Sequence, residues 1–409
     1  MYRLIDWRLA SQRTSPKISH STFFRMSHIR EINDANELEE LRLLWAALLP
    51  VTPGASFFHS LDWLQVYWKH FGSDQRMRVL VVSVADKPVG ILPLVVRRES
   101  TRIGGVRLLT YPLHDWGSWY GPIGPNPTVT LVEGLKHIQR TKQDWDLLDL
   151  RWIQRRVHDR GRTRTAMQVA GFEPQWNPWV ENSWIDLSGD WDSYWATRTT
   201  EWRNNVRRCE RRVAQQGKIE YVRYRPLGTA VGDGEPRWDL YDACEQIAER
   251  SWQGSSVTGT TLSHDSIRTY LRAAHERAAE RGAVDLNLLL LDGQPAAFAY
   301  AYQYQGYVYG LRMGFDANVS KEGTGTVLQY NVIRDCFARG DGLYDLGPDA
   351  SAAKRYWRTS LETSFRCTHF NENSWKAQVL RCKRAVKHWW QGSPQVGGEA
   401  VFPTASSVG

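Results

Sequence analysis

Alternating apolar and polar residues form two similar patterns that lie far apart in the chain. Residues 79–96 predict a strand, a turn that contains Asp86, and a second strand. Residues 286–304 predict the same order of elements around Asp292, and another strand follows over 307–313. Because both patterns lie in similar α–β–β surroundings, we infer that the chain contains a duplicated domain.

Helices are expected between these strands, where apolar residues recur at helical spacing. The pattern predicts helices over 36–49, 200–217 and 265–281. Asn36 and Glu39 have the spacing of a capping box at the start of the first helix. Together these elements predict an α/β (α+β) fold in which a mixed, mostly antiparallel sheet is flanked by helices.

Neither end of the chain carries a periodic pattern. Residues 1–25 lack the apolar segment of a signal peptide, and Met26 stands just before the first patterned region. We therefore expect an unstructured extension or an upstream gene start there, and a loose tail rich in Gly, Ser and Pro from residue 391. No apolar run approaches the ~20 residues of a membrane-spanning helix, so we expect a cytoplasmic protein with no integral membrane segment.

Cysteine and histidine spacing gives no sign of a metal site. The sequence has five cysteines, and none of them belongs to a CxxC pair. An odd number at this spacing argues against a disulfide framework and a zinc knuckle, and fits a reducing cytoplasm. His114, His158 and His264 also lack the spacing of metal ligands. We predict that the protein holds no metal.

The net charge and the tryptophan content both indicate what kind of partner the protein binds. The net charge of +8 indicates an anionic partner, which could be the phosphates of a cofactor, RNA or an acidic glycan. Twenty tryptophans favour a ligand that carries a sugar or a base. The helix over 200–217 is the most basic, with Arg203, Arg207, Arg208, Arg211 and Arg212. This is either a solvated helix face or a patch for tRNA or another polyanion.

A glycine-rich loop precedes the helix that runs to about residue 337. It consists of Gly323, Thr324, Gly325 and Thr326. Glycines allow a close approach to the backbone, and the first turn of a helix offers unpaired N–H groups and a positive dipole end. The loop therefore predicts a phosphate-binding site; the alternative is a tight loop that binds nothing.

Several longer motifs resemble a known family. The second half contains "LLLLDGQPAAFAYAY", "YVYGLRMGFD", the glycine loop and "YDLGPDASAAKRYWRTS", and the first half contains "FFHSLDWLQVYWKHFG" and "VLVVSVADKPVGILPLVVRR". This order resembles the CelD/BcsL-like (BioF2-like) acetyltransferases of the GNAT superfamily, which are related to the FemAB transferases. The resemblance spans roughly residues 30–385. Its most specific part is a strand ending in Asp345, followed by Gly347, Asp349, Lys354 and Trp357.

The resemblance implies two tandem GNAT-like domains, each with its own sheet. The chain then divides into an unstructured extension over 1–27, an N-terminal domain over 28–190, a basic bridging helix over 191–217, a C-terminal acetyltransferase domain over 218–390 and a tail over 391–409.

The family also implies a donor. The C-terminal domain is expected to bind acyl-CoA, first of all acetyl-CoA, as a co-substrate. The residues that this assigns to the donor are Lys321, Gly323, Thr324, Gly325, Thr326 and Arg312. The loop departs from the usual GNAT pattern because Ser320 stands where Arg or Gln is common, and Lys321 then supplies the charge.

Direct transfer from a thioester requires a base and a proton donor, with no covalent enzyme intermediate. The sequence agrees, since it contains no GxSxG motif. The candidate bases are Asp349 and Asp115, and the candidate proton donors to the leaving thiolate are Tyr309 and Tyr356. The candidate substrate-binding residues are Lys354, Trp357 and Trp116. Each of these is otherwise a solvated, capping or core side chain.

Three functions remain open from the sequence. The first is transfer of an acyl group to an amine or hydroxyl of a small molecule, a sugar or a cell-envelope polysaccharide precursor, because relatives of this kind are associated with exopolysaccharide synthesis. The second is FemAB-type transfer from aminoacyl-tRNA. The third is a non-catalytic scaffold that binds a glycan or a protein partner. The acceptor and the oligomeric state are not determined by the sequence.

Overall fold

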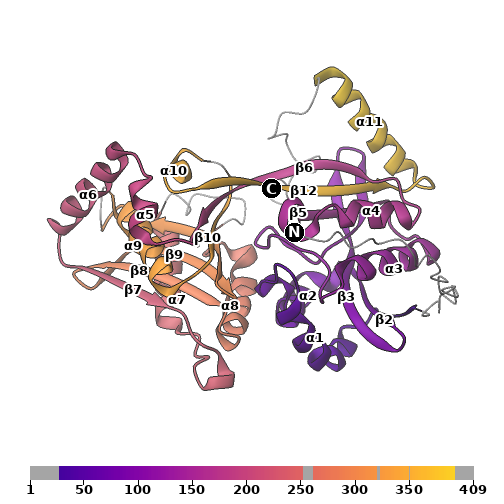
Figure 1. Cartoon of the computed structure of the whole chain (residues 1–409), viewed down its shortest axis with the longest axis horizontal. Helices are drawn as coiled ribbons and strands as arrows, with labels where there is room; N and C mark the ends of the chain where they lie inside the picture. Colours follow the sequence, from indigo (N-terminus) through magenta and orange to yellow (C-terminus); the bar gives the residue numbers. More distant parts are fainter. Residues whose placement is uncertain (1–26, 252–260, 320–322, 350, 392–409) are drawn as a thin grey trace, which may run out of the picture.

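A computed structural model of the 409-residue chain describes residues 27–251, 261–319, 323–349 and 351–391 (Figure 1). The predictions for the extension and the tail therefore fall outside the described residues, apart from Ser27 and Gln391. We call residues 27–190 the N-terminal half and residues 191–391 the C-terminal half.

One mixed sheet runs through both halves. Within the described residues its strands are β1 (Ser27–Ile32), β2 (Arg76–Val84), β3 (Lys87–Thr101), β4 (Gly104–Thr110), β5 (Leu147–Gln154), β6 (Gln175–Asp186), β7 (Ile219–Tyr224), β8 (Val284–Leu291), β9 (Gln294–Tyr304), β10 (Tyr307–Phe315), β11 (Leu343–Pro348) and β12 (Ser360–Phe370). Their spatial order is β1-β2-β3-β4-β5-β12-β6-β11-β10-β9-β8-β7. All neighbouring pairs are antiparallel except β4–β5 and β10–β11.

Helices cover both faces of this sheet. They are α1 (Arg42–Leu48), α2 (Leu61–Phe71), α3 (Pro127–Arg140), α4 (Arg162–Val169), α5 (Trp191–Ala196), α6 (Thr200–Ala214), α7 (Trp238–Arg250), α8 (Asp265–Glu280), α9 (Thr324–Arg339), α10 (Ala352–Arg355) and α11 (Trp375–Gln391). The predicted α/β class with a mostly antiparallel sheet is confirmed.

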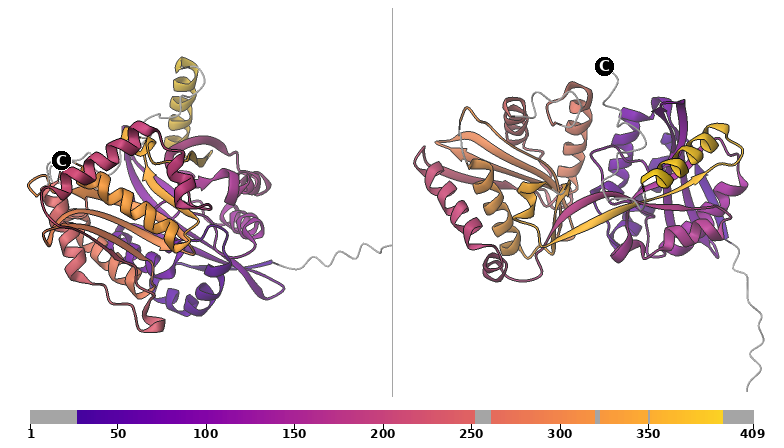
Figure 2. Two further views of the ribbon diagram at one scale, coloured as in Figure 1. Left: turned by 60° about the vertical axis from the view of Figure 1, so that its left-hand side comes forward. Right: turned by 90° about the horizontal axis from the view of Figure 1, so that it is seen from above.

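The strand order is symmetric when β1 to β6 are matched with β7 to β12. The last strand of each set lies in the territory of the other, because β12 pairs with β5 and β6 pairs with β11. These two strands also pair with each other, from Ser360 opposite Trp184 to Thr368 opposite Gln175. Figure 2 shows them crossing between the halves. Strand exchange therefore ties the halves together, and the proposed domain boundaries stay a prediction.

Both predicted hairpins are present, as β2–β3 and β8–β9. Their turns place Asp86 at φ 60° and Asp292 at φ 49°, a left-handed conformation that Asp tolerates and that matches the twist of a two-residue hairpin turn. The predicted capping box at Asn36 and Glu39 is wrong. Asp34 caps this segment instead, because its carboxylate accepts the N–H of Asn36, and the first turn is a 3-10 helix over Ala35–Leu41.

Strand β9 shows how the sequence places helices on opposite faces. Phe298, Tyr300 and Tyr302 point to one face, into the core that also contains residues of α7 and α8. The intervening Ala297, Ala299 and Ala301 point to the other face, into the core that contains α6 and α9. Small side chains let α9 lie close to the sheet, which helps to fix the position of its N-terminus.

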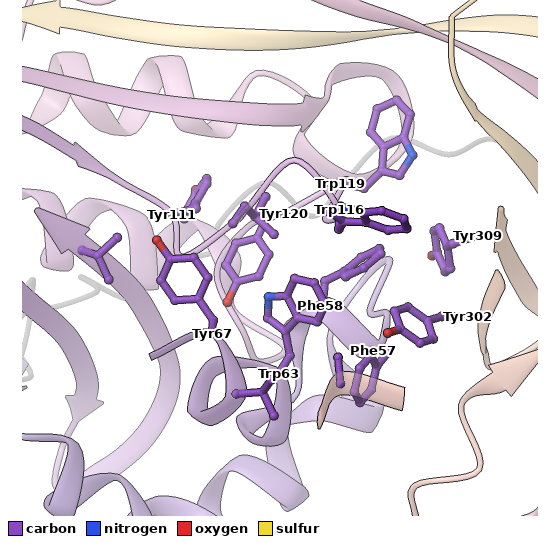
Figure 3. Close-up of a cluster of buried hydrophobic side chains, with 14 of the residues drawn as sticks. Phe57, Phe58, Trp63, Tyr67, Tyr111, Trp116, Trp119, Tyr120, Tyr302 and Tyr309 are labelled. Atoms are coloured by element: carbon purple, nitrogen blue, oxygen red, sulfur yellow. The ribbon is translucent and has the colours of Figure 1, made fainter. Parts of the chain in front are cut away.

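Aromatic residues join the two halves in one buried cluster. Figure 3 shows Phe57, Phe58 and Trp63 of the N-terminal half meeting Tyr302 and Tyr309 of the C-terminal half. The ring centroids of Phe57 and Tyr302 are 4.7 Å apart, and those of Phe58 and Tyr309 are 6.1 Å apart. The contact between the halves is therefore part of the core.

Candidate active site

Strands β10 and β11 pair for only three residues and then part. Tyr307–Tyr309 lie parallel to Leu343–Asp345, and no further pairing follows. Two glycines allow a close approach just after the last paired residues: a Cβ on Gly347 would lie 2.9 Å from the carbonyl oxygen of Gly310. Gly347 also has φ +83°, which an L side chain rarely adopts. The arrangement opens one edge of each strand beside the N-terminus of α9.

The glycine loop lies at the end of β10. Gly323 has φ +86°, and a Cβ there would lie 2.7 Å from the Cβ of Cys209 on α6, so only glycine fits between the two helices. A Cβ on Gly325 would make ordinary contacts of 3.6 Å with Met313 and Phe315 of β10. Lys321 lies outside the described residues.

The first turn of α9 has features that suit a phosphate. The first intrahelical bond runs from Val327 N–H to the Gly323 carbonyl, which leaves the preceding N–H groups of the turn without a helical partner. Thr324 is only 1% exposed, and its hydroxyl has no hydrogen-bond partner among the described residues. These groups suit a phosphate, and their assignment to the pyrophosphate of an acyl-CoA stays a prediction.

A buried carboxylate, Asp345, lies where the strands part. It accepts hydrogen bonds from Trp119 Nε1 at 2.5 Å, from Asn182 Nδ2 at 3.0 Å and from Gly347 N at 2.8 Å. Burial raises the pKa of Asp345, and these donors offset only part of the effect. Because Trp119 and Asn182 belong to the N-terminal half, this carboxylate is completed by both halves of the chain.

One cation, Lys354, lies near Asp345, and a second, Arg312, lies near Lys354. Lys354 donates to the carbonyls of Gly347, at 3.2 Å, and of Pro348. Burial lowers the pKa of Lys354, while Asp345 and then Asp349 act in the opposite direction. The guanidinium of Arg312 lies 4.3 Å from the ring centroid of Trp116, and burial lowers its pKa to about 10, so it stays charged at neutral pH.

The predicted acid and base residues fall into two places. Tyr309 is buried beside Asp345; burial and then the Asp345 carboxylate raise its pKa. Asp115 is exposed, and its interaction with Arg312 acts to raise the pKa of that guanidinium. Asp349 is also exposed, and its interaction with Lys354 acts to raise the pKa of that amine. The structure thus brings Tyr309, Arg312, Trp116, Lys354, Asp115 and Asp349 around one region.

Tyr356 and Trp357 lie apart from this group, against α6. The ring of Tyr356 stacks on Trp202 with centroids 4.3 Å apart. Trp357 is 5% exposed and contacts Trp202 edge to face. Their roles as proton donor and substrate contact remain predictions, and for Trp357 the burial leaves little ring surface to offer a ligand.

The basic face of α6 forms an open groove of about 660 Å³. Arg207, Arg208 and Arg211 line it together with the stacked pair Trp202 and Tyr356. Because α6 packs against α9 at Gly323, the groove and the glycine loop belong to the same side of the C-terminal half.

In the N-terminal half, β4 and β5 correspond to β10 and β11, and they also separate after a short parallel pairing. Strands β4 and β5 pair in parallel only at Leu108–Leu147 and Leu109–Leu148. A cavity of about 50 Å³ lies nearby, lined among others by His59, Tyr120 and Trp152. The helix that follows, α3, has no side-chain cap.

Two negative findings apply to the part of the chain that the structure describes. It contains no group of three or more His, Cys, Asp or Glu side chains that could hold a metal ion. None of its helices is long and apolar enough to cross a membrane.

Known proteins resemble this chain in part of its sequence and in its fold. Residues 201–356 match the family model of the acetyltransferase (GNAT) domain. FemX is similar in fold, with a TM-score of 0.56 and 11% identity over 87% of this chain and 99% of that chain. L-PGS from Bacillus licheniformis gives a TM-score of 0.50 and 12% identity over 88% of this chain and 99% of that chain. No curated protein is significantly similar in sequence.

Residues 201–356 of the C-terminal half are thus similar to GNAT-type acetyltransferase domains. The whole chain has a fold similar to that of FemX, which at this identity is a likeness of fold alone. The sequence match therefore concerns the GNAT domain, and a relationship to the FemAB transferases stays a prediction. The narrower CelD/BcsL-like assignment stays a prediction.

Sequence reasoning missed three contributors to the site. Asp345 was noted only as part of a motif, although a strand-ending Asp before a Gly turn marks a polar group at a sheet opening. Trp119 and Asn182 reach it from 226 and 163 residues away in sequence, and no local pattern indicates that distance.

Proposed function

We propose that the protein is a cytoplasmic acyltransferase that moves an acyl group from acyl-CoA to an amine or hydroxyl. Acetyl is the acyl group that we expect. The acceptor would be a small molecule, a sugar or a cell-envelope polysaccharide precursor, as in the CelD/BcsL-like family. The observation that carries the proposal is the position of the glycine loop: the free N–H groups of α9 and the buried carboxylate Asp345 flank the same parting of β10 and β11.

These residues can support direct transfer. The acceptor nucleophile attacks the thioester carbonyl, and a carboxylate takes its proton. A buried carboxylate with a raised pKa is a stronger base than an exposed one, which favours Asp345 over Asp349 and Asp115. The oxyanion that forms is stabilised by nearby positive charge, for which Lys354 and Arg312 are the candidates. Collapse releases the thiolate, which Tyr309 can protonate.

A second candidate donor is aminoacyl-tRNA. The observation in its favour is the groove on α6, where arginines flank the stacked rings of Trp202 and Tyr356 beside the glycine loop. Guanidinium groups bind phosphates, and exposed aromatic rings stack on bases. The same groove could accept the adenosine end of CoA, so the groove alone does not decide between the donors.

We expect Gly325→Trp to abolish binding of acetyl-CoA, because the indole would fill the space above the first turn of α9. Gly325→Ala should fold normally, since its methyl group makes only ordinary contacts. Calorimetric titration with acetyl-CoA, longer acyl-CoAs and bulk tRNA at two salt concentrations would measure this. Gly189→Trp is the matched control, because Gly189 is exposed and has nothing within 4 Å of its Cβ position.

Micromolar acetyl-CoA binding that Gly325→Trp loses and Gly189→Trp keeps would support the CoA donor. Salt-sensitive tRNA binding without CoA binding would favour the aminoacyl-tRNA donor. If the wild-type chain bound neither, both donors would be refuted and the scaffold alternative would stand.

A further inference from the structure

A cluster of arginines lies on the face of the sheet that α11 covers, where β12 adjoins the strands of the N-terminal half. Arg97 of β3, Arg151 of β5, Arg366 of β12 and Arg384 of α11 form this cluster, which we call the arginine cluster. Its first three side chains are 21%, 12% and 4% exposed. The cluster is therefore largely removed from water but still partly open at Arg97.

Two carboxylates pair with these arginines. Asp149, which is fully buried, binds Arg366 at 2.5 Å and Arg151 at 2.6 Å. Glu99 binds Arg97 at 2.7 Å and Arg151 at 3.0 Å. Within the described residues, these four arginines face two carboxylates, which leaves a surplus of two positive charges. Burying unbalanced charge is costly, so a surplus of this kind calls for a counter-charge.

The buried network of the C-terminal half is a useful contrast. There Arg223 and Arg225 meet Asp285 and Asp341, and Asp335 is also bound to Arg223, so the carboxylates are not outnumbered. Although burial opposes it, Asp285 raises the pKa of both arginines. The arginine cluster is mixed: although burial opposes it, carboxylates raise the pKa of Arg97 and Arg151, whereas burial lowers the pKa of Arg366 to about 10 and lowers that of Arg384.

Unused hydrogen-bond donors accompany the surplus charge. Arg97 Nε and Arg384 Nη1 are buried and have no hydrogen-bond partner among the described residues. The same holds for Trp179 Nε1, whose ring lies under the guanidinium groups of Arg151 and Arg366 at 4.9 and 4.7 Å. Such groups nearly always have an acceptor in native proteins.

The position of the cluster connects it to the candidate active site. Arg97 donates to the carbonyl of Leu113 at 2.9 Å, at the start of the loop that carries Trp116 and Trp119. Trp116 lies under Arg312, and Trp119 binds Asp345. A ligand held by the arginine cluster would therefore adjoin the loop that completes the site.

We propose that the arginine cluster is a binding site for a phosphate group. A phosphate monoester carries a charge of about −1.5 to −2 at neutral pH and several strong acceptor oxygens, so it matches the surplus charge and the unused donors together. A carboxylate would neutralise only half of the surplus. The site is separate from the glycine loop, and the proposal does not depend on which donor that loop binds.

The test is titration of the full-length chain with inorganic phosphate, glucose 1-phosphate and acetate at low ionic strength, with binding measured by calorimetry. Arg384→Met removes one charge and one unused donor but keeps an apolar stem to pack on the Phe370 ring. We expect it to weaken phosphate binding by about 10- to 100-fold, from the ~1.5–3 kcal/mol of a charged hydrogen bond.

Arg381→Met is the matched control. It lies one turn earlier on α11 and pairs with Glu173 at the surface, so it changes the same charge on the same helix outside the cluster. Gly325→Trp should leave this phosphate binding intact, which separates it from donor binding at α9. Tighter binding of glucose 1-phosphate than of phosphate would place the group on a larger ligand, and equal binding would indicate the free anion. No phosphate binding by the wild-type chain, binding of acetate as tight as that of phosphate, or equal weakening by both arginine variants would overturn the proposal.

Discussion

Replacing Asp345 by Asn is expected to lower kcat for acyl transfer by about 10²- to 10⁴-fold, the usual contribution of a general base. The substitution keeps the size of the side chain but removes the group that can take the proton. It also turns one acceptor oxygen into a donor that faces Trp119 and Asn182, so the fold of the variant must be checked by circular dichroism and thermal unfolding.

The pH profile distinguishes a base from a positioning residue. Because burial raises the pKa of Asp345, the wild-type profile of kcat/KM should fall on the acid side at a pH above the ordinary range of an aspartate, and the fall should vanish in Asp345→Asn. Asp349→Asn is the comparison, because Asp349 is exposed and lies shortly after Asp345 in the chain. A large loss in Asp349→Asn with near-normal activity in Asp345→Asn would restore Asp349, one of the two bases that the sequence predicts.

Replacing Trp63 by Ala is expected to lower the free energy of unfolding by about 3–5 kcal/mol, as for other buried Trp truncations. Trp63 is fully buried. The centroid of its ring lies 4.9 Å from that of Phe58, 5.6 Å from that of Tyr270 and 6.4 Å from that of Tyr302. Tyr270 and Tyr302 belong to the C-terminal half. Trp375→Ala, at a side chain that is 66% exposed, should change stability by less than about 0.5 kcal/mol.

The same experiment tests the strand exchange. Because β6 and β12 each complete the other half of the sheet, loss of packing between the halves should destabilise both together. Chemical denaturation followed by fluorescence and by circular dichroism should then give one coincident transition in wild type and in Trp63→Ala. Two separate transitions in the variant would show that the halves fold independently of their shared strands.

Local patterns in the sequence were sufficient for much of the C-terminal half. The hairpin around Asp292 follows strict alternation and a turn that needs positive φ, and α9 follows a glycine loop, so both could be predicted from short stretches. The proximity of Tyr309 and Arg312 to one opening follows from their place on β10. These features depend on neighbours in sequence.

The features that were missed depend on distant contacts. Most residues of β6 are only half-buried, because the strand lies between the halves, so it shows no clean alternation. Its pairing with both β11 and β12 cannot be read from either segment alone. The same is true of Asp149, whose partner Arg366 is 217 residues away. Strand exchange and buried ion pairs are decided by the whole fold.

The most direct test of the central claim is a crystal structure of the full-length chain with acetyl-CoA. We expect the pyrophosphate on the N–H groups of Gly325 and Thr326, and the acetyl group in the parting of β10 and β11 near Asp345. Acetyl-CoA bound instead in the cavity beside His59 and Tyr120, or anywhere else away from α9, would contradict the assignment of the donor site to the C-terminal half.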